Sequence, residues 1–220
     1  MSEWFGRQAE RIRRIAAYVM AGKTDELLYS LNNRWREIDL EHVSVDVLGL
    51  PPDRSHFHSS SGGPDCARIL RSLRIPSGSV GLDLGSGKGG AAMTMARFPF
   101  AEVIGVELSE ALVRMARTNV QRARLRNVRF VQGDAGMFTD LDRVTHIYMY
   151  NPFPCVVMEA VIANLRSSLA RCDREVTLIY KNPLCHDAIV REPRTFDKIS
   201  ETFVGEHWWF VYKHLPLSRS

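Results

Sequence analysis

The chain contains 220 residues, of which 45% are hydrophobic, and carries a formal net charge of +4. This length and composition predict one substantial soluble α/β domain with its own core, and they exclude fibrous, repeat and low-complexity classes. The mild excess of positive charge permits nucleic acid or acidic peptides as partners but does not require them. No apolar run is long enough to span a bilayer and no secretory signal is recognisable, so we expect a cytoplasmic protein without membrane contact.

The cysteines set a second limit. None of them forms a C-x-x-C pair, and the four positions are Cys66, Cys155, Cys172 and Cys185. Such spacing favours reduced thiols over a disulfide framework or a zinc site. We therefore predict neither a disulfide nor a metal centre.

Residues 1–79 are predicted to form a helical extension. Apolar residues recur at helical spacing over 2–21. Thr24 is expected to cap a second helix, and Pro64 is expected to begin a third helix that runs to Leu73. We interpret this extension as a lid that packs on the core.

A loop rich in serine and glycine precedes that third helix and contains His56, Phe57 and His58. Two histidines without a nearby third ligand are weak evidence for a metal site, so polar loop residues are the favoured interpretation. Because the loop comes shortly before the first core strand, Phe57 and His58 are also candidates for contact with a substrate.

The stretch that organises the rest of the chain is an apolar strand that ends in an acid and opens into glycines. It reads Asp83-Leu84-Gly85-Ser86-Gly87-Lys88-Gly89. This pattern predicts a buried strand, a sharp turn and the start of a helix. Glycine lets the backbone approach a ligand closely, and the open N–H groups of the helix start can face that ligand. Lys88 is expected to be a solvated residue at the helix start.

Three kinds of glycine loop compete for this stretch. A phosphate-binding loop requires Ser or Thr after the lysine, and Gly89 stands there instead. The dinucleotide pattern G-x-G-x-x-G is satisfied by Gly85, Gly87 and Gly90, which alone is a weak match. The S-adenosylmethionine pattern, acid-x-G-x-G-x-G, is satisfied in full. A carboxylate at position 83 suits a ligand with a cationic amino acid end and repels a pyrophosphate, so the acid favours S-adenosylmethionine.

Three later strands also end in polar side chains. They are predicted at 102–107, 128–132 and 146–150. Glu107 can accept hydrogen bonds from both hydroxyls of a ribose, Asp134 can reach an adenine amino group, and Asn151 follows the last of the three strands.

Helices are predicted between these strands and after them, at 90–97, 109–122 and 154–169, followed by a fifth strand at 175–180. Ser109 is the expected N-cap of the second of these helices. The alternation implies a parallel sheet with right-handed crossovers. Residues 198–204 and 208–215 alternate apolar and polar side chains and are predicted to form an antiparallel edge hairpin, in which one side of Trp208-Trp209-Phe210 faces the core.

From about Val80 to Tyr180, the chain resembles the class I S-adenosylmethionine-dependent methyltransferases. The resemblance implies a doubly wound, mostly parallel seven-stranded sheet over residues 80–220, with S-adenosylmethionine as the cofactor. The implied cofactor-binding residues are Asp83, Gly85, Ser86, Gly87, Gly89, Glu107, Leu108, Asp134, Ala135 and Asn151.

Within the class, the motifs look most like two groups. One is the non-SET histone-lysine methyltransferases, and the other is a set of small bacterial methyltransferases with poorly defined substrates. The stretches 150–153 and 179–183 resemble the bacterial set more closely.

Asn151-Pro152-Phe153-Pro154 invites comparison with Asn-Pro-Pro-aromatic, the signature of amino-group methylation. There the Asn accepts a hydrogen bond from the target nitrogen and the aromatic ring stacks on it. Here Phe153 replaces the second proline, so a simple turn into the following helix is the competing interpretation. Asn151 is the residue that we place beside the transferred methyl group, with Phe153 as a candidate substrate contact.

The sequence therefore predicts a methyltransferase that acts on a protein, a peptide or a small molecule, as a monomer or a homodimer. The alternatives are an RNA or DNA methyltransferase and a non-catalytic module that binds S-adenosylmethionine or NAD. Arginines on and after the helix at 109–122 are expected to form a solvated face rather than a phosphate-binding surface.

Overall fold

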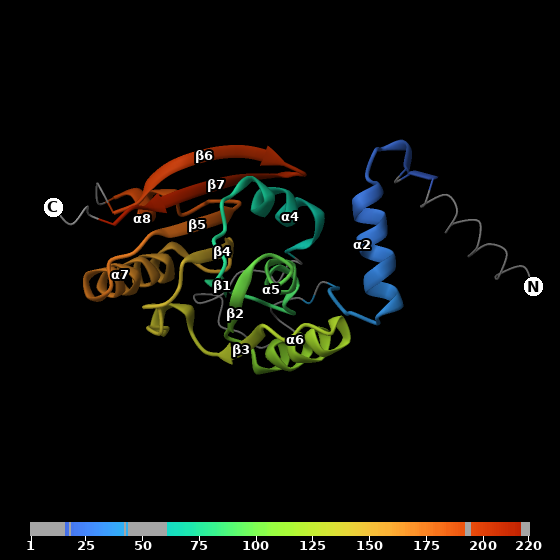
Figure 1. Cartoon of the computed structure of the whole chain (residues 1–220), viewed down its shortest axis with the longest axis horizontal. Helices are drawn as coiled ribbons and strands as arrows, with labels where there is room; N and C mark the ends of the chain where they lie inside the picture. Colours follow the sequence, from blue (N-terminus) through green and yellow to red (C-terminus); the bar gives the residue numbers. More distant parts are fainter. Residues whose placement is uncertain (1–15, 18, 42, 44–60, 192–194, 217–220) are drawn as a thin grey trace, which may run out of the picture.

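The computed structural model describes residues 16–17, 19–41, 43, 61–191 and 195–216, and Figure 1 shows the arrangement of its elements. A seven-stranded sheet with the order β3-β2-β1-β4-β5-β7-β6 forms its centre. The strands are β1 (Ser79–Leu84), β2 (Phe100–Glu107), β3 (Val128–Gln132), β4 (His146–Tyr150), β5 (Val176–Lys181), β6 (Asp197–Val204) and β7 (His207–His214). The first five are parallel, and β7 pairs antiparallel with both β5 and β6.

Helices connect these strands and cover both faces of the sheet (Figure 1). They are α2 (Thr24–Trp35), α4 (Gly63–Ser72), α5 (Gly90–Met95), α6 (Glu110–Ala123), η1 (Ala135–Met137), α7 (Cys155–Arg171) and α8 (His186–Val190). The predicted doubly wound sheet with an antiparallel edge hairpin is thus confirmed. The division of the chain at residue 79 stays a prediction.

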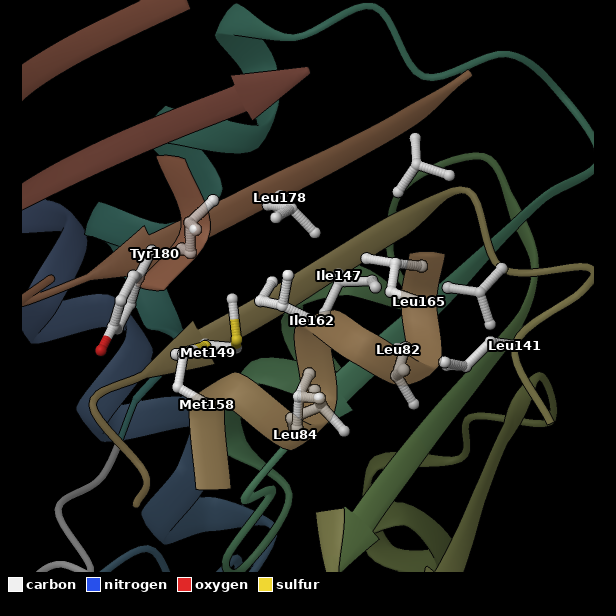
Figure 2. Packing of buried hydrophobic residues seen from close by; sticks show 14 of the residues in the cluster. Leu82, Leu84, Leu141, Ile147, Met149, Met158, Ile162, Leu165, Leu178 and Tyr180 are labelled. Atoms are coloured by element: carbon white, nitrogen blue, oxygen red, sulfur yellow. The ribbon is translucent and has the colours of Figure 1, made fainter. Parts of the chain in front are cut away.

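Two hydrophobic clusters fill the space between the sheet and its helices. Figure 2 shows the first, in which Leu82, Leu84 and Ile147 of the sheet face Ile162 and Leu165 of α7. The second cluster packs the opposite face against α4, α5 and α6. Successive strand residues point to opposite faces. In β1, whose six residues are all buried, Val80, Leu82 and Leu84 belong to the first cluster, whereas Gly81 faces Met95 of α5 on the other side.

Local predictions agree with the structure where short-range signals dominate. Ser109 caps α6, since its hydroxyl accepts a hydrogen bond from the Leu112 N–H at 3.4 Å. In the hairpin, Trp209 is 1% exposed and Trp208 is 49% exposed, as the strand alternation predicts. One cap is displaced by a residue: the N-cap of α2 is Lys23 instead of Thr24, and no side chain caps that end.

The prediction of reduced cysteines is wrong for two of the four. Cys155, at the start of α7, and Cys185, just before α8, form a disulfide between residues whose Cα atoms are 5.3 Å apart. Their sequence separation of 30 hides the pairing, because the loops after the adjacent strands β4 and β5 bring them together only in the folded sheet. Cys66 and Cys172 are free, as predicted.

In the described part of the chain, no helix combines the length and the apolar character that crossing a bilayer requires.

Replacing Cys155 with serine is expected to lower the free energy of unfolding by about 2–4 kcal/mol, because the unfolded chain regains the freedom of a closed loop. Cys155 is exposed, so a serine there creates no buried polar group. Urea denaturation without reductant measures the difference. Cys172→Ser, which removes an exposed free thiol, is the matched control. Equal stability of the wild type and Cys155→Ser would contradict the crosslink.

Candidate functional site

The glycine loop after β1 has the backbone conformation that its sequence predicts. Gly85, Gly87 and Gly89 have φ values of 71°, 53° and 85°, in the left-handed region where a Cβ is costly. The N–H groups of Gly85 and Ser86 both donate to the Val106 carbonyl, at 2.9 and 3.0 Å. The loop is therefore fixed against β2 before any ligand binds.

The loop also touches the segment that follows β4. A Cβ on Gly85 would lie 2.3 Å from the Pro152 Cβ, so only glycine fits. This contact lies between β1 and β4, the neighbours at which the strand order reverses. Ligands of doubly wound sheets bind outside the carboxyl ends of the strands at such a point.

Asp83 lies at the carboxyl end of β1 and is 1% exposed. Its Oδ2 accepts a hydrogen bond from the Ala92 N–H of α5 at 2.9 Å. Burial raises the pKa of Asp83 to about 7, and the nearby Glu107 carboxylate adds to the rise while the Ala92 hydrogen bond opposes it. Asp83 is thus a buried carboxyl group, and a cationic group of a ligand would stabilise its ionised form.

Glu107, at the end of β2, joins two loops. Its Oε2 accepts from the Gly87 N–H at 2.8 Å, and its Oε1 accepts from the Ser109 N–H at 2.9 Å. Burial raises the pKa of Glu107, and these N–H donors oppose the rise. Each carboxylate oxygen can accept more than one hydrogen bond, so Glu107 can hold the loop and still accept from ligand hydroxyls.

Two buried polar atoms of the site have no hydrogen-bond partner within the described structure: Ser86 Oγ and Asn151 Oδ1. Buried polar atoms usually have partners, so both are positions where a ligand can donate. Asn151 also has a left-handed φ of 36°, a strained conformation of the kind that clusters at functional sites.

Asp134, Ala135 and Leu108 occupy the loops next to these residues. Asp134 Oδ1 accepts from the Gly136 N–H at 2.8 Å and so caps η1, which begins with Ala135. Leu108 is half-buried between Glu107 and Ser109. Their predicted contacts with a cofactor stay predictions.

Of the predicted substrate residues, only Phe153 lies in the described part of the chain. Phe153 is 3% exposed and packs in the hydrophobic cluster with Val157 and Met158 of α7, and its contact with a substrate stays a prediction. Phe57 and His58 lie outside the described residues, as does His56. The residues that are described contain no group of three or more His, Cys, Asp or Glu arranged to hold a metal ion.

Lys88 differs from its prediction as a solvated residue. It is 2% exposed, and its Nζ lies 2.7 Å from Asp39 Oδ1 in an ion pair. The Asn119 amide of α6 donates to the carbonyls of Lys88 and Asp39, at 3.0 and 2.7 Å. These contacts fasten the segment after α2 to the start of α5. The sequence separation of 49 positions explains why no local pattern revealed the pair of Asp39 and Lys88.

Sequence reasoning also missed a polar cluster beside Asn151. The Tyr150 hydroxyl lies 2.8 Å from His207 Nε2, and Lys181 Nζ lies 3.9 Å from the centroid of the Tyr150 ring. One signal could have found it, because Tyr150 and Lys181 each precede an Asn-Pro pair at the ends of neighbouring strands.

Comparison with known proteins gives one matching family model and one curated relative. Residues 82–172 match the family model described as a methyltransferase domain. A 4-amino-L-phenylalanine/4-methylamino-L-phenylalanine methyltransferase from Streptomyces pristinaespiralis is 44% identical over 73 residues, which cover 32% of this chain and 24% of that protein. The chain therefore matches only about a quarter of the length of this relative.

Solved structures share the fold. A SAM-dependent methyltransferase from Aquifex aeolicus has a TM-score of 0.54 at 16% identity, over 68% of this chain and 88% of that chain. An RNA methyltransferase from Salinibacter ruber in complex with S-adenosyl-L-homocysteine has a TM-score of 0.51 at 19% identity, over 70% and 94%. The predicted relationship to non-SET histone-lysine methyltransferases finds no support in these matches. The core of the chain therefore has the Rossmann-like fold of the class I methyltransferases, and residues 82–172 of this core match the methyltransferase domain model.

Proposed function

We propose that this chain binds S-adenosylmethionine across the carboxyl ends of β1, β2 and β4 and transfers its methyl group to the amino nitrogen of a small molecule. The observation that carries the proposal is the pair of buried carboxylates, Asp83 and Glu107, on either side of a glycine loop that is already folded. The pyrophosphate of a dinucleotide would be repelled by Asp83, whereas Glu107 suits the ribose of either ligand.

The residues fit the parts of this cofactor. Asp83 suits its cationic amino group, Glu107 suits its two ribose hydroxyls, and Asp134 suits its adenine amino group. When bound, the cofactor supplies a methyl group on a sulfonium, whose thioether is a good leaving group. The protein's contribution is then to orient the acceptor and exclude water, which can lower a barrier by roughly 7–11 kcal/mol in favourable cases.

The choice of an amino acceptor has two supports. Asn151 Oδ1 is buried without a partner beside the glycine loop, and an amide oxygen in that position accepts from an N–H of the nucleophile. The relative from Streptomyces pristinaespiralis is named for methylating an amino-substituted phenylalanine. We therefore propose an aromatic amine or a similar small amine as the acceptor, with protein and peptide amines as the nearest alternatives.

A nucleic acid acceptor receives less support from the arginines on and after α6. Arg114 forms an ion pair with Glu110, and Arg129 forms one with Glu102, at 2.5 and 2.6 Å. Arg117 donates to the Phe130 carbonyl at 3.0 Å. Arginines engaged in this way offer a weaker phosphate surface than free ones.

Glu107→Gln is expected to weaken S-adenosylhomocysteine binding by about 10- to 100-fold, since hydrogen bonds to a charged acceptor contribute roughly 1.5–3 kcal/mol. Isothermal titration calorimetry measures the effect. Glu102→Gln is the matched control, because Glu102 lies on the same strand but pairs with Arg129 and Arg143 instead. Equal affinity in the Glu107 variant and the control would contradict the ribose assignment.

The raised pKa of Asp83, about 7, predicts that S-adenosylhomocysteine affinity falls as the pH is lowered from 8 to 6, because protonation removes the partner of the cationic amino group. Calorimetry at several pH values tests this, and Asp83→Asn should bind weakly with a flatter profile. The same shift acts on stability. Asp83 loses its proton at a lower pH in the unfolded chain than in the folded one. Its contribution to the free energy of unfolding therefore declines as the pH rises between 3.8 and about 7. A pH-independent affinity in the wild type would count against this role.

Methyl transfer itself is tested with tritiated S-adenosylmethionine, using 4-amino-L-phenylalanine and the protein, RNA and small-molecule fractions of a cell extract as acceptors. We expect label in the defined amine or the small-molecule fraction. Asn151→Gly, which keeps the left-handed backbone, should reduce transfer by about 100-fold, and Asn182→Gly, at the equivalent position after β5 with φ 51°, should not. Label in the RNA fraction would show that the acceptor is a nucleic acid instead of a small amine. Tight cofactor binding without any transfer would indicate a non-catalytic binding module.

A further inference from the structure

A row of four side chains crosses the carboxyl edge of the sheet on the face that α4 covers. Tyr150 of β4 and Lys181 of β5 are register partners, and Lys181 is in turn the partner of Trp209 of β7. Trp209 belongs to the hydrophobic cluster on this face together with Cys66 of α4, and the partly buried Tyr150 packs against that cluster. His207, two residues before Trp209, completes the row at the strand end.

The contacts inside this row couple a phenol, an imidazole and an ammonium. The Tyr150 hydroxyl and His207 Nε2 are 2.8 Å apart, and their ring centroids are 5.2 Å apart. Lys181 Nζ lies over the Tyr150 ring at 3.9 Å and over the Trp209 ring at 5.5 Å. The Lys181 ammonium thus contacts the faces of two aromatic rings, and the Asp65 carboxylate of α4 also interacts with its charge.

The row adjoins the proposed acceptor position. Tyr150 directly precedes Asn151, whose amide oxygen is buried without a described partner. The next residue, Pro152, packs against Gly85 of the glycine loop. The Tyr150–His207 pair is therefore anchored on the strand end from which Asn151 projects, on the carboxyl edge where the cofactor is proposed to bind.

We propose that Tyr150 and His207 form a proton relay that removes the proton released by the acceptor nitrogen, an inference that rests on the proposed function. As the nitrogen forms its bond to the methyl carbon, the carbon–sulfur bond breaks and its electron pair stays on sulfur. The nitrogen then gives one proton to Tyr150 Oη, while the hydroxyl proton of Tyr150 passes to His207 Nε2. The products are the methylated amine, a neutral thioether and a protonated His207. The positive charge of Lys181 over the ring stabilises the negative charge that develops on the Tyr150 oxygen as its proton leaves.

The surroundings of His207 keep it ready to accept that proton. Burial lowers the pKa of His207, and Lys181 lowers it further, while Glu206 and Asp65 of α4 oppose both effects. The imidazole is thus neutral at pH 7, which is the form that a proton acceptor requires.

The sheet contains a second pair of the same chemistry, which provides a control. His186 Nδ1 of α8 lies 2.7 Å from the Tyr212 hydroxyl. Tyr212 belongs to the cluster on the α7 face and pairs in register with Leu178, inside the sheet and away from its carboxyl edge. If both pairs only stabilised the fold, removing either tyrosine hydroxyl would affect methyl transfer alike. The relay predicts that only the hydroxyl of Tyr150 matters for the transfer.

The tautomer of His207 tests the relay without any turnover. In the full chain with bound S-adenosylhomocysteine, ¹⁵N NMR of labelled imidazoles distinguishes a bare Nε2 from a protonated one. The relay requires Nε2 to be unprotonated at pH 7.5, so that it accepts from Tyr150, and Tyr150→Phe should shift this signal. A proton on Nε2 at pH 7.5 would overturn the proposal, because the imidazole would then donate to the phenol.

Kinetics with 4-amino-L-phenylalanine and tritiated S-adenosylmethionine provide the second test. Tyr150→Phe should lower kcat by about 100-fold and leave S-adenosylhomocysteine affinity within about twofold, while Tyr212→Phe leaves both unchanged. Wild-type kcat should fall as the pH drops through the pKa of His207, and His207→Gln should abolish that limb. Equal kcat in Tyr150→Phe and Tyr212→Phe would overturn the relay. Failure of the wild type to bind S-adenosylhomocysteine would instead refute the proposed function. If 4-amino-L-phenylalanine is not methylated, the protonation state of His207 Nε2 alone decides for or against the relay.

Discussion

The site depends on one interaction: the carboxylate of Glu107 accepts backbone N–H groups from Gly87 on one side and from Ser109 on the other. Burying a carboxylate is costly unless donors replace its lost water. Here the donors belong to the loops after β1 and β2, so satisfying the charge also fixes both loops. Asp83 repeats the arrangement with the Ala92 N–H of α5. Two buried acids thus preorganise the glycine loop and leave lone pairs for a ligand.

The topology decides what else can reach this loop. Because β1 lies between β2 and β4, the segment after β4 packs directly on the glycine loop through Pro152 and Gly85. Asn151 is held there in a left-handed conformation with a buried amide oxygen. The disulfide then links the loop after β4 to the loop after β5, where Asn182 has the same backbone conformation. A covalent bond therefore links the loops on the proposed acceptor side of the site, whereas hydrogen bonds of Glu107 hold the loops on the cofactor side.

Sequence reasoning predicted the features that arise from local physics. Strand alternation predicted that one side of the segment 208–210 faces the core, which is the side of Trp209, and the acid followed by glycines located the loop. Apart from the cap of α2, which is displaced by one residue, the contacts that were missed are pairs between distant residues. The ion pair of Lys88 with Asp39, the disulfide, and the Tyr150–His207 hydrogen bond join residues 49, 30 and 57 positions apart. Such pairs depend on which strands become neighbours, and no periodicity or spacing in a single sequence encodes that order.

The two Tyr–His pairs show how the same residues acquire different roles from their position in a sheet. Tyr212 and His186 meet on the α7 face, where Phe210 also packs against the imidazole. An aromatic enclosure of this kind favours a fixed hydrogen bond, which here satisfies the buried Tyr212 hydroxyl and the half-buried imidazole of His186. Tyr150 ends its strand instead, beside an ammonium and next to the strained Asn151. Parallel strands place their last side chains on one edge, so a polar pair at that edge adjoins bound ligands, whereas an identical pair within the sheet stays part of the packing.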